Sequence, residues 1–259
     1  MRKKRVEAGW LVTGAGSGFG REVARRLAGR GERLALLDRD RAGLDATAAL
    51  LDGPAPHLEV ADVTDPPAIR EAVERSERAL GALGHVFHSA GVLATGHVEE
   101  LPAAEYRRMI EVNYLGSVHV AQATLPALRR ASSRGRATLT LVASIGGLRG
   151  FPEMAGYCAS KFAVVGFAQA LAAELVGTDV EVKALCPPAG DTPMVRNLER
   201  RPPIYKLSPL FSAETVVEGW LDQLDRRDRV ALVDLQSKAL WRLDRLAPRV
   251  VDLVVRLAR

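Results

Sequence analysis

Short apolar runs alternate along the chain with longer segments whose apolar residues recur three and four positions apart. The runs have the length and branched or leucine-rich composition of strands, and the longer segments have the periodicity of helices. This alternation is typical of β-α-β units, which build a parallel sheet covered by helices. Strands are expected at residues 10–13, 33–38, 57–61, 85–89, 137–144, 180–186 and 229–233. Helices are expected at residues 21–30, 41–51, 67–80, 104–130 and 156–176.

Two segments depart from that alternation. Residues 187–211 hold six prolines among scattered bulky residues, which predicts a long irregular loop. Such loops often cover binding sites, and the alternative is an ordered surface excursion. Beyond the last strand, apolar residues recur at helical spacing after a break at Pro248. We therefore predict one domain over residues 1–235, with a substrate loop at about 188–212, and a C-terminal amphipathic helical extension over residues 236–259.

Glycines cluster where the first predicted strand leads into the first helix, over residues 13–20. The backbone N–H groups and the dipole at such a helix start favour a diphosphate. Gly14 permits a tight turn, Gly18 lets the main chain approach the phosphates, and Gly20 lets the helix pack on the sheet. Glycine turns between strand and helix are common, so the cluster alone is a weak indication of a nucleotide.

Asp38 ends the second predicted strand, near the spacing at which a carboxylate accepts hydrogen bonds from an adenosine ribose. Such a carboxylate repels a 2′-phosphate, and the glycine turn contains no basic residue, so NAD is favoured over NADP. Arg39, next along the chain, could partly offset the repulsion and admit NADP. The structural alternative for Asp38 is a residue that forms the turn at the strand end.

Tyr157 and Lys161 lie four apart on a predicted helix and therefore share one face. A tyrosine hydroxyl, with a pKa of about 10, is a poor base at neutral pH, and a nearby ammonium lowers that pKa by favouring the phenolate. The spacing alone is weak evidence, because such a pair also covers grooves on ordinary helices.

Together with these two residues, the Thr-Gly-x-x-x-Gly-x-Gly turn at 13–20, Asn113 and Ser144 make the chain similar to the short-chain dehydrogenase/reductase family over roughly residues 9–235. The resemblance implies a Rossmann-like, doubly wound parallel sheet of about seven strands flanked by helices. It also implies an NAD(P)-dependent enzyme that acts on CH–OH groups and interconverts an alcohol and the corresponding ketone. The expected assembly is a homodimer or homotetramer.

The resemblance assigns roles to four residues. Tyr157 exchanges the proton as general acid and base, and Lys161 tunes it and holds the nicotinamide ribose. Ser144 hydrogen-bonds the substrate oxygen. Asn113 holds a water in a proton relay, its alternative being an exposed polar residue without a role. The residues expected to contact the coenzyme are Gly14, Ser17, Gly18, Phe19, Gly20, Asp38, Asp62, Val63, Ala90, Gly91, Tyr157, Lys161, Pro187 and Thr192.

The sequence departs from the family pattern in two places. The family has Asn-Asn-Ala-Gly after the fourth strand, whereas residues 88–91 are His-Ser-Ala-Gly. We interpret His88 as a hydrogen-bonded structural residue, because its imidazole can donate to a neighbouring strand. After the sixth strand, Pro188 stiffens the loop and removes a backbone donor, so nicotinamide contacts could differ, while Thr192 remains available to the carboxamide.

Composition and charge exclude several other classes. The 259 residues are 47% hydrophobic and 26% charged, which is typical of a globular domain. The net charge of +5 is spread over arginines with acidic neighbours, so no nucleic-acid partner is predicted. Two cysteines suggest a reducing compartment and form no zinc spacing, so no metal is expected. Without a secretory start or 18 consecutive apolar residues, we expect a cytoplasmic protein.

The loop and the extension leave alternatives open. Aliphatic residues of the loop, if turned inward, favour a lipid-like or steroid-like hydrophobic alcohol, whereas inward arginines would suit an anionic carrier. The extension mixes apolar residues with arginines, so it could contact a membrane surface or pack on its own domain or a partner subunit. A catalytically silent dinucleotide-binding regulatory or scaffold protein, and a membrane-surface interaction module, are the competing functions.

Overall fold

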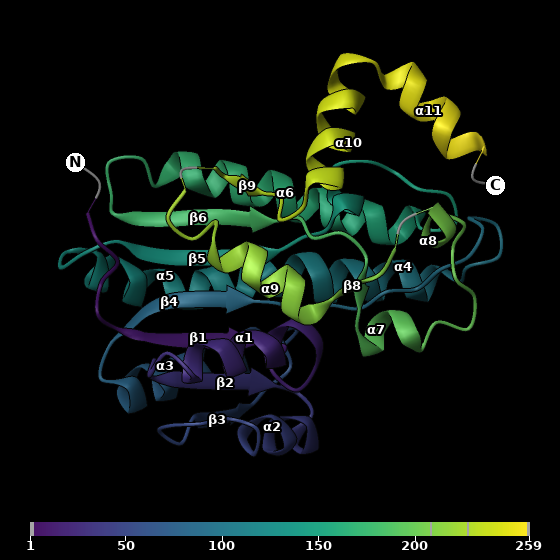
Figure 1. Cartoon of the computed structure of the whole chain (residues 1–259). Helices are drawn as coiled ribbons and strands as arrows, with labels where there is room; N and C mark the ends of the chain where they lie inside the picture. Colours follow the sequence, from purple (N-terminus) through teal and green to yellow (C-terminus); the bar gives the residue numbers. More distant parts are fainter. Residues whose placement is uncertain (1–2, 208, 227, 258–259) are drawn as a thin grey trace.

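A seven-stranded parallel sheet forms the centre of the computed structural model, which describes residues 3–207, 209–226 and 228–257 (Figure 1). The strand order is β3-β2-β1-β4-β5-β6-β9, so the chain winds outward in both directions from the boundary between β1 and β4. This arrangement confirms the predicted doubly wound, Rossmann-like sheet. The strands are β1 (Gly9–Thr13), β2 (Leu34–Asp38), β3 (His57–Val60), β4 (Leu83–His88), β5 (Ala137–Val142), β6 (Val180–Leu185) and β9 (Val230–Ala231).

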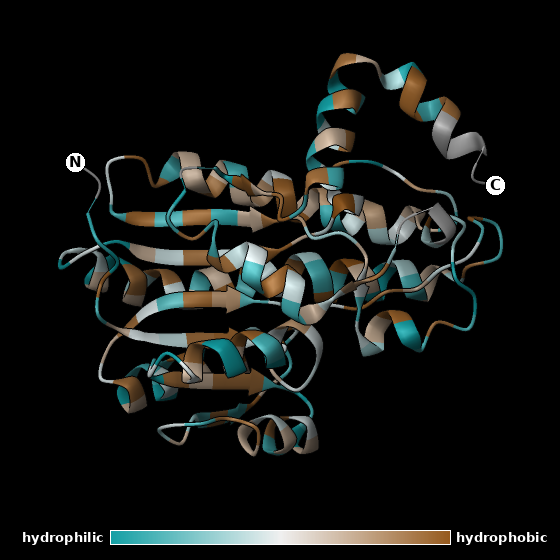
Figure 2. Ribbon diagram, viewed as in Figure 1, coloured by the Kyte–Doolittle hydropathy of each residue, from teal (hydrophilic) through white to brown (hydrophobic). Residues whose placement is uncertain are grey.

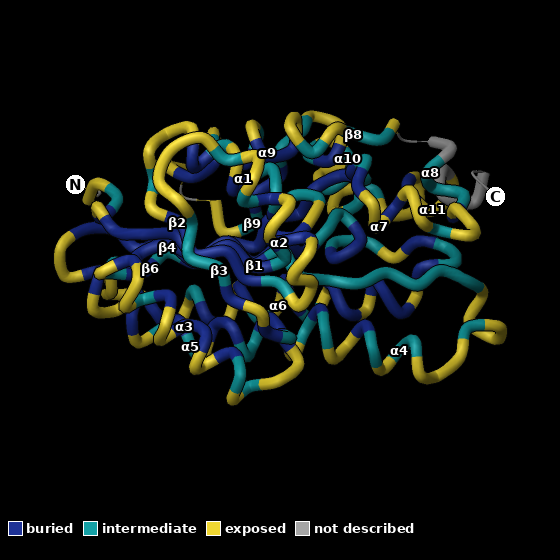
Figure 3. The backbone as a smooth tube through the Cα atoms, turned by 90° about the horizontal axis from the view of Figure 1, so that it is seen from below, coloured by how far each residue is buried: buried dark blue, intermediate teal, exposed yellow. Residues whose placement is uncertain are grey.

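Helices cover both faces of the sheet, because every residue of its central strand β1 is buried. In β1, Leu11 packs with one hydrophobic cluster, whereas Trp10 and Val12 pack with another. Successive strand side chains point to opposite faces, and both faces are buried, so the strand is a continuous apolar run. Figure 3 shows the strands as a buried layer between more exposed segments. One face is covered by α3 (Pro66–Leu80), α5 (Gly116–Ser132) and α6 (Ala155–Glu174), the other by α1 (Gly18–Ala28), α2 (Arg41–Ala48) and α9 (Ala213–Leu221).

The helix predicted over residues 104–130 is interrupted. It consists of α4 (Ala103–Met109), a π-helical turn η1 (Ile110–Leu115) and α5. Asn113 lies in the π-helical turn, and such local widenings of a helix are common at functional sites. Helix α9 was not expected from the sequence, although Ser212 caps its start by accepting a hydrogen bond from the Thr215 N–H.

The predicted irregular loop contains four short elements. They are β7 (Gly190–Asp191), α7 (Pro193–Arg196), α8 (Ile204–Leu207) and β8 (Phe211–Ser212), and β7 pairs with β8 in a separate two-stranded sheet. The 3-10 turn η2 (Ile145–Gly147) follows β5.

Two helices form the C-terminal extension and project from the body of the molecule (Figure 1). They are α10 (Leu235–Leu246) and α11 (Pro248–Leu257), so the predicted break at Pro248 is confirmed. Arg149, which follows η2, forms ion pairs with Asp244 of α10 and Asp252 of α11. The inner face of the extension therefore packs on its own domain. Among the described helices, none has the length and apolar character to cross a bilayer.

Candidate active site

A cavity of about 580 Å³ opens at the carboxyl ends of the parallel strands. Segments that follow β1, β2, β3, β4, β5 and β6 all contribute to its wall. In open α/β sheets this edge, beside the point where the winding reverses, is where ligands bind. The cavity is therefore the candidate site.

The glycine turn forms one end of the cavity and has the geometry that a diphosphate requires. Gly14 and Gly18 have positive φ angles of 66° and 52°, which residues with side chains rarely adopt. A Cβ on Gly20 would lie 2.1 Å from the Gly14 carbonyl oxygen, so only glycine lets α1 pack this closely. The Ser17 side chain makes no capping hydrogen bond, which leaves the start of α1 to a ligand.

Asp38 lies at the end of β2 and is held by the backbone. Its carboxylate accepts hydrogen bonds from the N–H groups of Gly16 at 2.9 Å and Asp40 at 3.0 Å. Arg39 is exposed and lies 3.7 Å from the carboxylate of Asp62. Burial alone would raise the pKa of Asp62, but hydrogen bonds from Thr64 and the charge of Arg39 lower it below its usual value. The arginine that could admit NADP therefore already has an acidic partner.

His88 and Ser89, which replace the family's two asparagines, bind the neighbouring strand β1. The Nδ1 atom of His88 lies 2.7 Å from the Thr13 hydroxyl, and the Ser89 hydroxyl donates to the Thr13 carbonyl at 2.7 Å. Burial, together with the charge of Lys161, lowers the pKa of His88 to about 3. The imidazole is therefore neutral at pH 7, which agrees with its structural interpretation.

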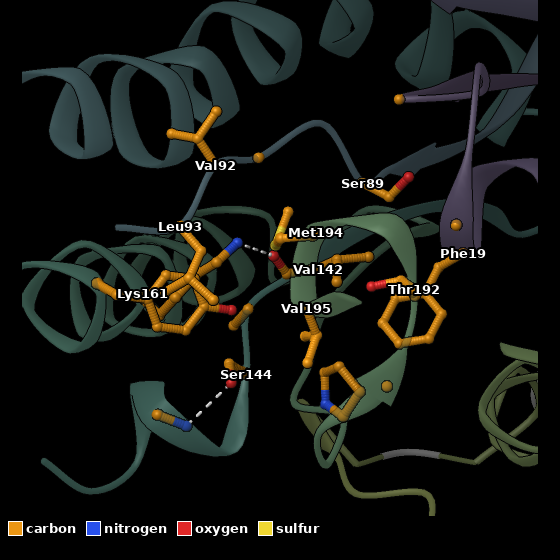
Figure 4. Close-up of a pocket in the computed structure, with 18 of the residues that line it drawn as sticks. Phe19, Ser89, Val92, Leu93, Val142, Ser144, Lys161, Thr192, Met194 and Val195 are labelled. Atoms are coloured by element: carbon orange, nitrogen blue, oxygen red, sulfur yellow. Dashed lines mark hydrogen bonds between the residues drawn. The ribbon is translucent and has the colours of Figure 1, made fainter. Parts of the chain in front are cut away.

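Tyr157 and Lys161 of α6 and Ser144, which follows β5, all line the cavity. Figure 4 shows Lys161 and Ser144. The Lys161 ammonium donates to the Val142 carbonyl at 2.8 Å and lies 5.8 Å from the centre of the Tyr157 ring. Ser144 hydrogen-bonds the Tyr157 hydroxyl and accepts from the Gly146 N–H at 3.1 Å. A polar oxygen placed beside Ser144 would therefore also face the phenol.

The pKa values of this pair differ from the expectation that Lys161 lowers the pKa of Tyr157. Burial raises the pKa of the Tyr157 hydroxyl above its usual value, and the hydrogen bond with Ser144 opposes this only in part. Burial also lowers the pKa of Lys161 to about 8, because the ammonium loses its hydration. The phenol is thus protonated at neutral pH, the form that donates to a ketone oxygen.

Asn113 lies in the π-helical turn and is bound by protein atoms. It is fully buried, lies behind the cavity wall and uses its side chain to bind protein atoms. Its Oδ1 accepts from the Val92 N–H at 2.7 Å, and its Nδ2 donates to the Val92 carbonyl at 3.0 Å and the Ser160 hydroxyl at 2.9 Å. These contacts rule out the alternative of an exposed polar residue, while the water relay stays a prediction. The Asn113 side chain joins η1 to the segment after β4.

The predicted coenzyme contacts lie in the cavity wall with one exception. Gly20 lies behind the glycine turn, where it permits helix packing. The residues found in the wall are Gly14, Ser17, Gly18, Phe19, Asp38, Asp62, Val63, Ala90, Gly91, Tyr157, Lys161, Pro187 and Thr192. Their arrangement from the glycine turn to Thr192 fits an elongated dinucleotide. When bound, such a coenzyme supplies or accepts the hydride of an alcohol–ketone conversion.

The far end of the cavity is apolar. Val195, Ile204 and Tyr205 of the predicted loop line it, but Leu198, Leu210 and Phe211 do not, and the Leu207 side chain lies outside the described residues. Sequence reasoning missed the other apolar lining residues there, which come from the segment before α6, the segment after β4 and the C-terminal helices. These are Leu93, Phe151, Met154, Leu240 and Val251.

The arginines of the predicted loop do not line the cavity. Arg196 pairs with Asp191 at 2.7 Å, and Arg200 pairs with Glu153 at 2.8 Å. Both are exposed, as is Arg201. The arrangement favours the hydrophobic alternative left open by the sequence over an anionic carrier bound by inward arginines.

A model of the short chain dehydrogenase family matches residues 10–203. The chain belongs to the short-chain dehydrogenase/reductase family. Members of this family are oxidoreductases that act on alcohols and ketones. The predicted membership is thereby confirmed.

Individual relatives cover most of the chain. It is 33% identical over 201 residues to 2-dehydro-3-deoxy-L-rhamnonate dehydrogenase (NAD(+)) of Sphingomonas, covering 77% of this chain and 79% of the relative. It is 33% identical over 217 residues to rat 17-beta-hydroxysteroid dehydrogenase 13, covering 82% and 70%. The crystal structure of a short-chain dehydrogenase/reductase from Burkholderia phymatum in complex with NAD superposes with a TM-score of 0.84 at 26% identity, covering 95% and 96%.

Proposed function

We propose that the protein interconverts a hydrophobic secondary alcohol and its ketone with NAD, with Tyr157 as the proton-transfer group. The observation that carries this proposal is the meeting of the phenol, the Ser144 hydroxyl and the Lys161 ammonium in a cavity that begins at a glycine turn. One end is built for a diphosphate and the other is apolar. The reacting oxygen of a substrate would lie between them, beside Ser144.

The chain's own groups supply the proton chemistry. In ketone reduction, the Tyr157 hydroxyl donates its proton to the oxygen that gains charge as the carbonyl carbon accepts a hydride. Ser144 stabilises that oxygen by a hydrogen bond. In alcohol oxidation, the Lys161 ammonium, held by the Val142 carbonyl, stabilises the phenolate form of Tyr157 beforehand. That phenolate takes the hydroxyl proton and becomes a phenol while the carbinol carbon gives up the hydride.

NAD is proposed as the coenzyme because Asp38 and Arg39 are arranged against a 2′-phosphate. The Asp38 carboxylate lines the cavity at the adenosine end, and Arg39 is paired with Asp62. The Sphingomonas relative carries NAD in its name, and the Burkholderia structure holds NAD. NADP remains the alternative coenzyme, and it would require Arg39 to leave Asp62 and bind the 2′-phosphate.

The substrate is proposed to be a hydrophobic alcohol or ketone, because aliphatic and aromatic side chains surround the space beyond Tyr157. Phe151, Met154, Ile204 and Leu240 lie in that wall, and burying such surfaces against an apolar ligand is favourable. A relative whose name specifies a hydroxysteroid is consistent with this class. We expect the active form to be a homodimer or homotetramer in the cytoplasm.

A panel of secondary alcohols and ketones of increasing apolar size, read by NADH absorbance, tests the proposal. We expect turnover that rises with apolar size and is lost in Tyr157→Phe. Loss is expected because phenylalanine keeps the ring that packs in the wall and lacks the transferable proton. A protein that binds NADH but gives no Tyr157-dependent absorbance change across the panel would instead be the catalytically silent regulatory protein.

A further inference from the structure

Leucine and valine side chains lie exposed on the outside of α10 and α11. Leu243, Leu246, Val250 and Leu253 expose 42%, 85%, 49% and 57% of their surface. They flank the bend between the two helices at spacings of three and four residues, and we call them the apolar corner. Figure 2 shows hydrophobic residues along both projecting helices. Leaving this much apolar surface in water is unfavourable, so its retention indicates a partner.

Cations surround the apolar corner. Arg242, Arg245 and Arg249 are exposed, and none of them forms an ion pair with the described carboxylates. The Arg245 guanidinium lies 4.7 Å from the centre of the Trp241 ring instead. A groove of about 410 Å³ beside α10 extends this surface to Lys238 and Arg229, with Asp228 as the one acidic residue among its described lining residues. The outer side of the extension is therefore both apolar and positively charged.

The acidic residues of α10 and α11 bind the body of the protein. Asp244 and Asp252 both bind Arg149, which joins α10 and α11 to the body of the protein. Two further residues of these helices, Leu240 and Val251, line the active-site cavity. The extension thus forms a wall of the cavity on its inner side and the apolar corner on its outer side.

We propose that the apolar corner docks on an anionic lipid surface and brings the mouth of the cavity close to substrates dissolved there. The choice of substrate rests on the proposed function, whereas the docking itself does not. Amphipathic helices with arginines beside an apolar face bury that face at the headgroup boundary, and anionic lipids attract the arginines.

Charge complementarity favours a lipid surface over a second copy of the chain. A two-fold contact through the apolar corner would place the same patch on both sides of the interface. Arg242, Arg245 and Arg249 of the two copies would then approach one another, and such like-charge contacts are unfavourable. An anionic surface, in contrast, neutralises all three arginines.

Flotation of the full chain with vesicles tests the docking. Vesicles of phosphatidylcholine with phosphatidylserine should bind the protein, and vesicles of phosphatidylcholine alone should bind it far less. Arg242→Gln/Arg245→Gln/Arg249→Gln should weaken binding to the anionic vesicles about a hundredfold, since each arginine near such a surface contributes about a factor of five. Leu246→Ser/Leu253→Ser should weaken it by about tenfold or more, because the apolar contact is lost.

Matched variants on other faces serve as controls. Val98→Ser/Val176→Ser removes two side chains that are 65% and 72% exposed. Arg70→Gln/Arg129→Gln/Arg134→Gln removes three exposed arginines, and thus the same net charge. Both controls should bind anionic vesicles like the wild type.

Three results would overturn the docking proposal. The first is that the wild-type protein does not float with anionic vesicles. The second is that the arginine variant and its control lose vesicle binding equally. The third is that the leucine variant changes the mass of the protein in solution but not its vesicle binding. The last result would make the apolar corner an interface between copies. Turnover of a water-soluble alcohol without vesicles reports separately on the proposed function. The arginine variant and the leucine variant should not change this turnover, because none of their five substituted residues lines the cavity.

Discussion

Asn113 offers a direct test of how the π-helical turn builds the active site. Asn113→Ala removes two hydrogen bonds to the backbone of Val92 and one to the Ser160 hydroxyl. A typical net contribution of about 1 kcal/mol per bond gives a loss of about 3 kcal/mol in the free energy of unfolding. For a chain of this size that lowers Tm by about 6–10 °C.

Urea and thermal unfolding at pH 7 measure this loss. Ser117→Ala is the matched control, because Ser117 is also buried next to η1 and its hydroxyl donates a single hydrogen bond, to the Asn113 carbonyl at 2.6 Å. The control should lose about 1 kcal/mol. If Asn113→Ala lost no more than the control, the side chain would not hold the Val92 segment, and the interpretation of Asn113 as a positioning residue would be wrong.

Two further variants test the coenzyme and the lysine. Asp38→Asn keeps an oxygen that can accept the Gly16 N–H but removes the charge. The ratio of kcat/KM for NADP over NAD should rise about 30-fold, and an unchanged ratio would refute the ribose contact. Lys161→Met should abolish turnover with coenzyme present. In the coenzyme-free protein it should raise the free energy of unfolding at pH 7 by about 2 kcal/mol. The fall in the pKa of Lys161 from 10.5 to about 8 lowers the stability of the wild type by about 3 kcal/mol. The variant regains this stability but loses the hydrogen bond to Val142, which contributes about 1 kcal/mol. Because burial disfavours the ammonium, this penalty is complete below pH 8 and disappears as pH rises toward 10.5, so a gain that persists there would contradict the cause.

The sheet was predictable because its strands are buried on both faces. Continuous apolar runs such as residues 34–38 differ clearly from the periodic helices beside them. Helix α9 was missed although its signals are present: Ser212 is a good N-cap, and Val216 and Trp220 lie four apart. The helix has only nine residues, so its apolar periodicity is short.

Site residues were predictable from the sequence only where they belong to a local sequence motif. The glycine turn and the Tyr157–Lys161 spacing are local patterns, and both reach the cavity as expected. Asn113 depends on where the chain after β4 passes, which no local pattern reveals. The same holds for Leu240, whose place in the cavity wall is set by the ion pairs of Arg149 with the C-terminal helices.

The perturbed pKa values could not be read from spacing either. The spacing of four positions from Tyr157 to Lys161 predicts a shared helix face but not the depth of burial. Burial removes water from both groups, so it raises the pKa of the phenol and lowers that of the ammonium. The three-dimensional environment, rather than the pairing, determines these protonation states.

The most direct test of the catalytic account compares hydride transfer and coenzyme binding in Tyr157→Phe. With a substrate from the alcohol and ketone panel, turnover followed by NADH absorbance should fall by at least about a hundredfold, as expected when a general acid is lost. NADH binding, followed by fluorescence titration, should stay within about threefold of the wild type, since the ring remains. Turnover close to the wild-type rate with NADH binding intact would contradict the role of the Tyr157 hydroxyl in proton transfer.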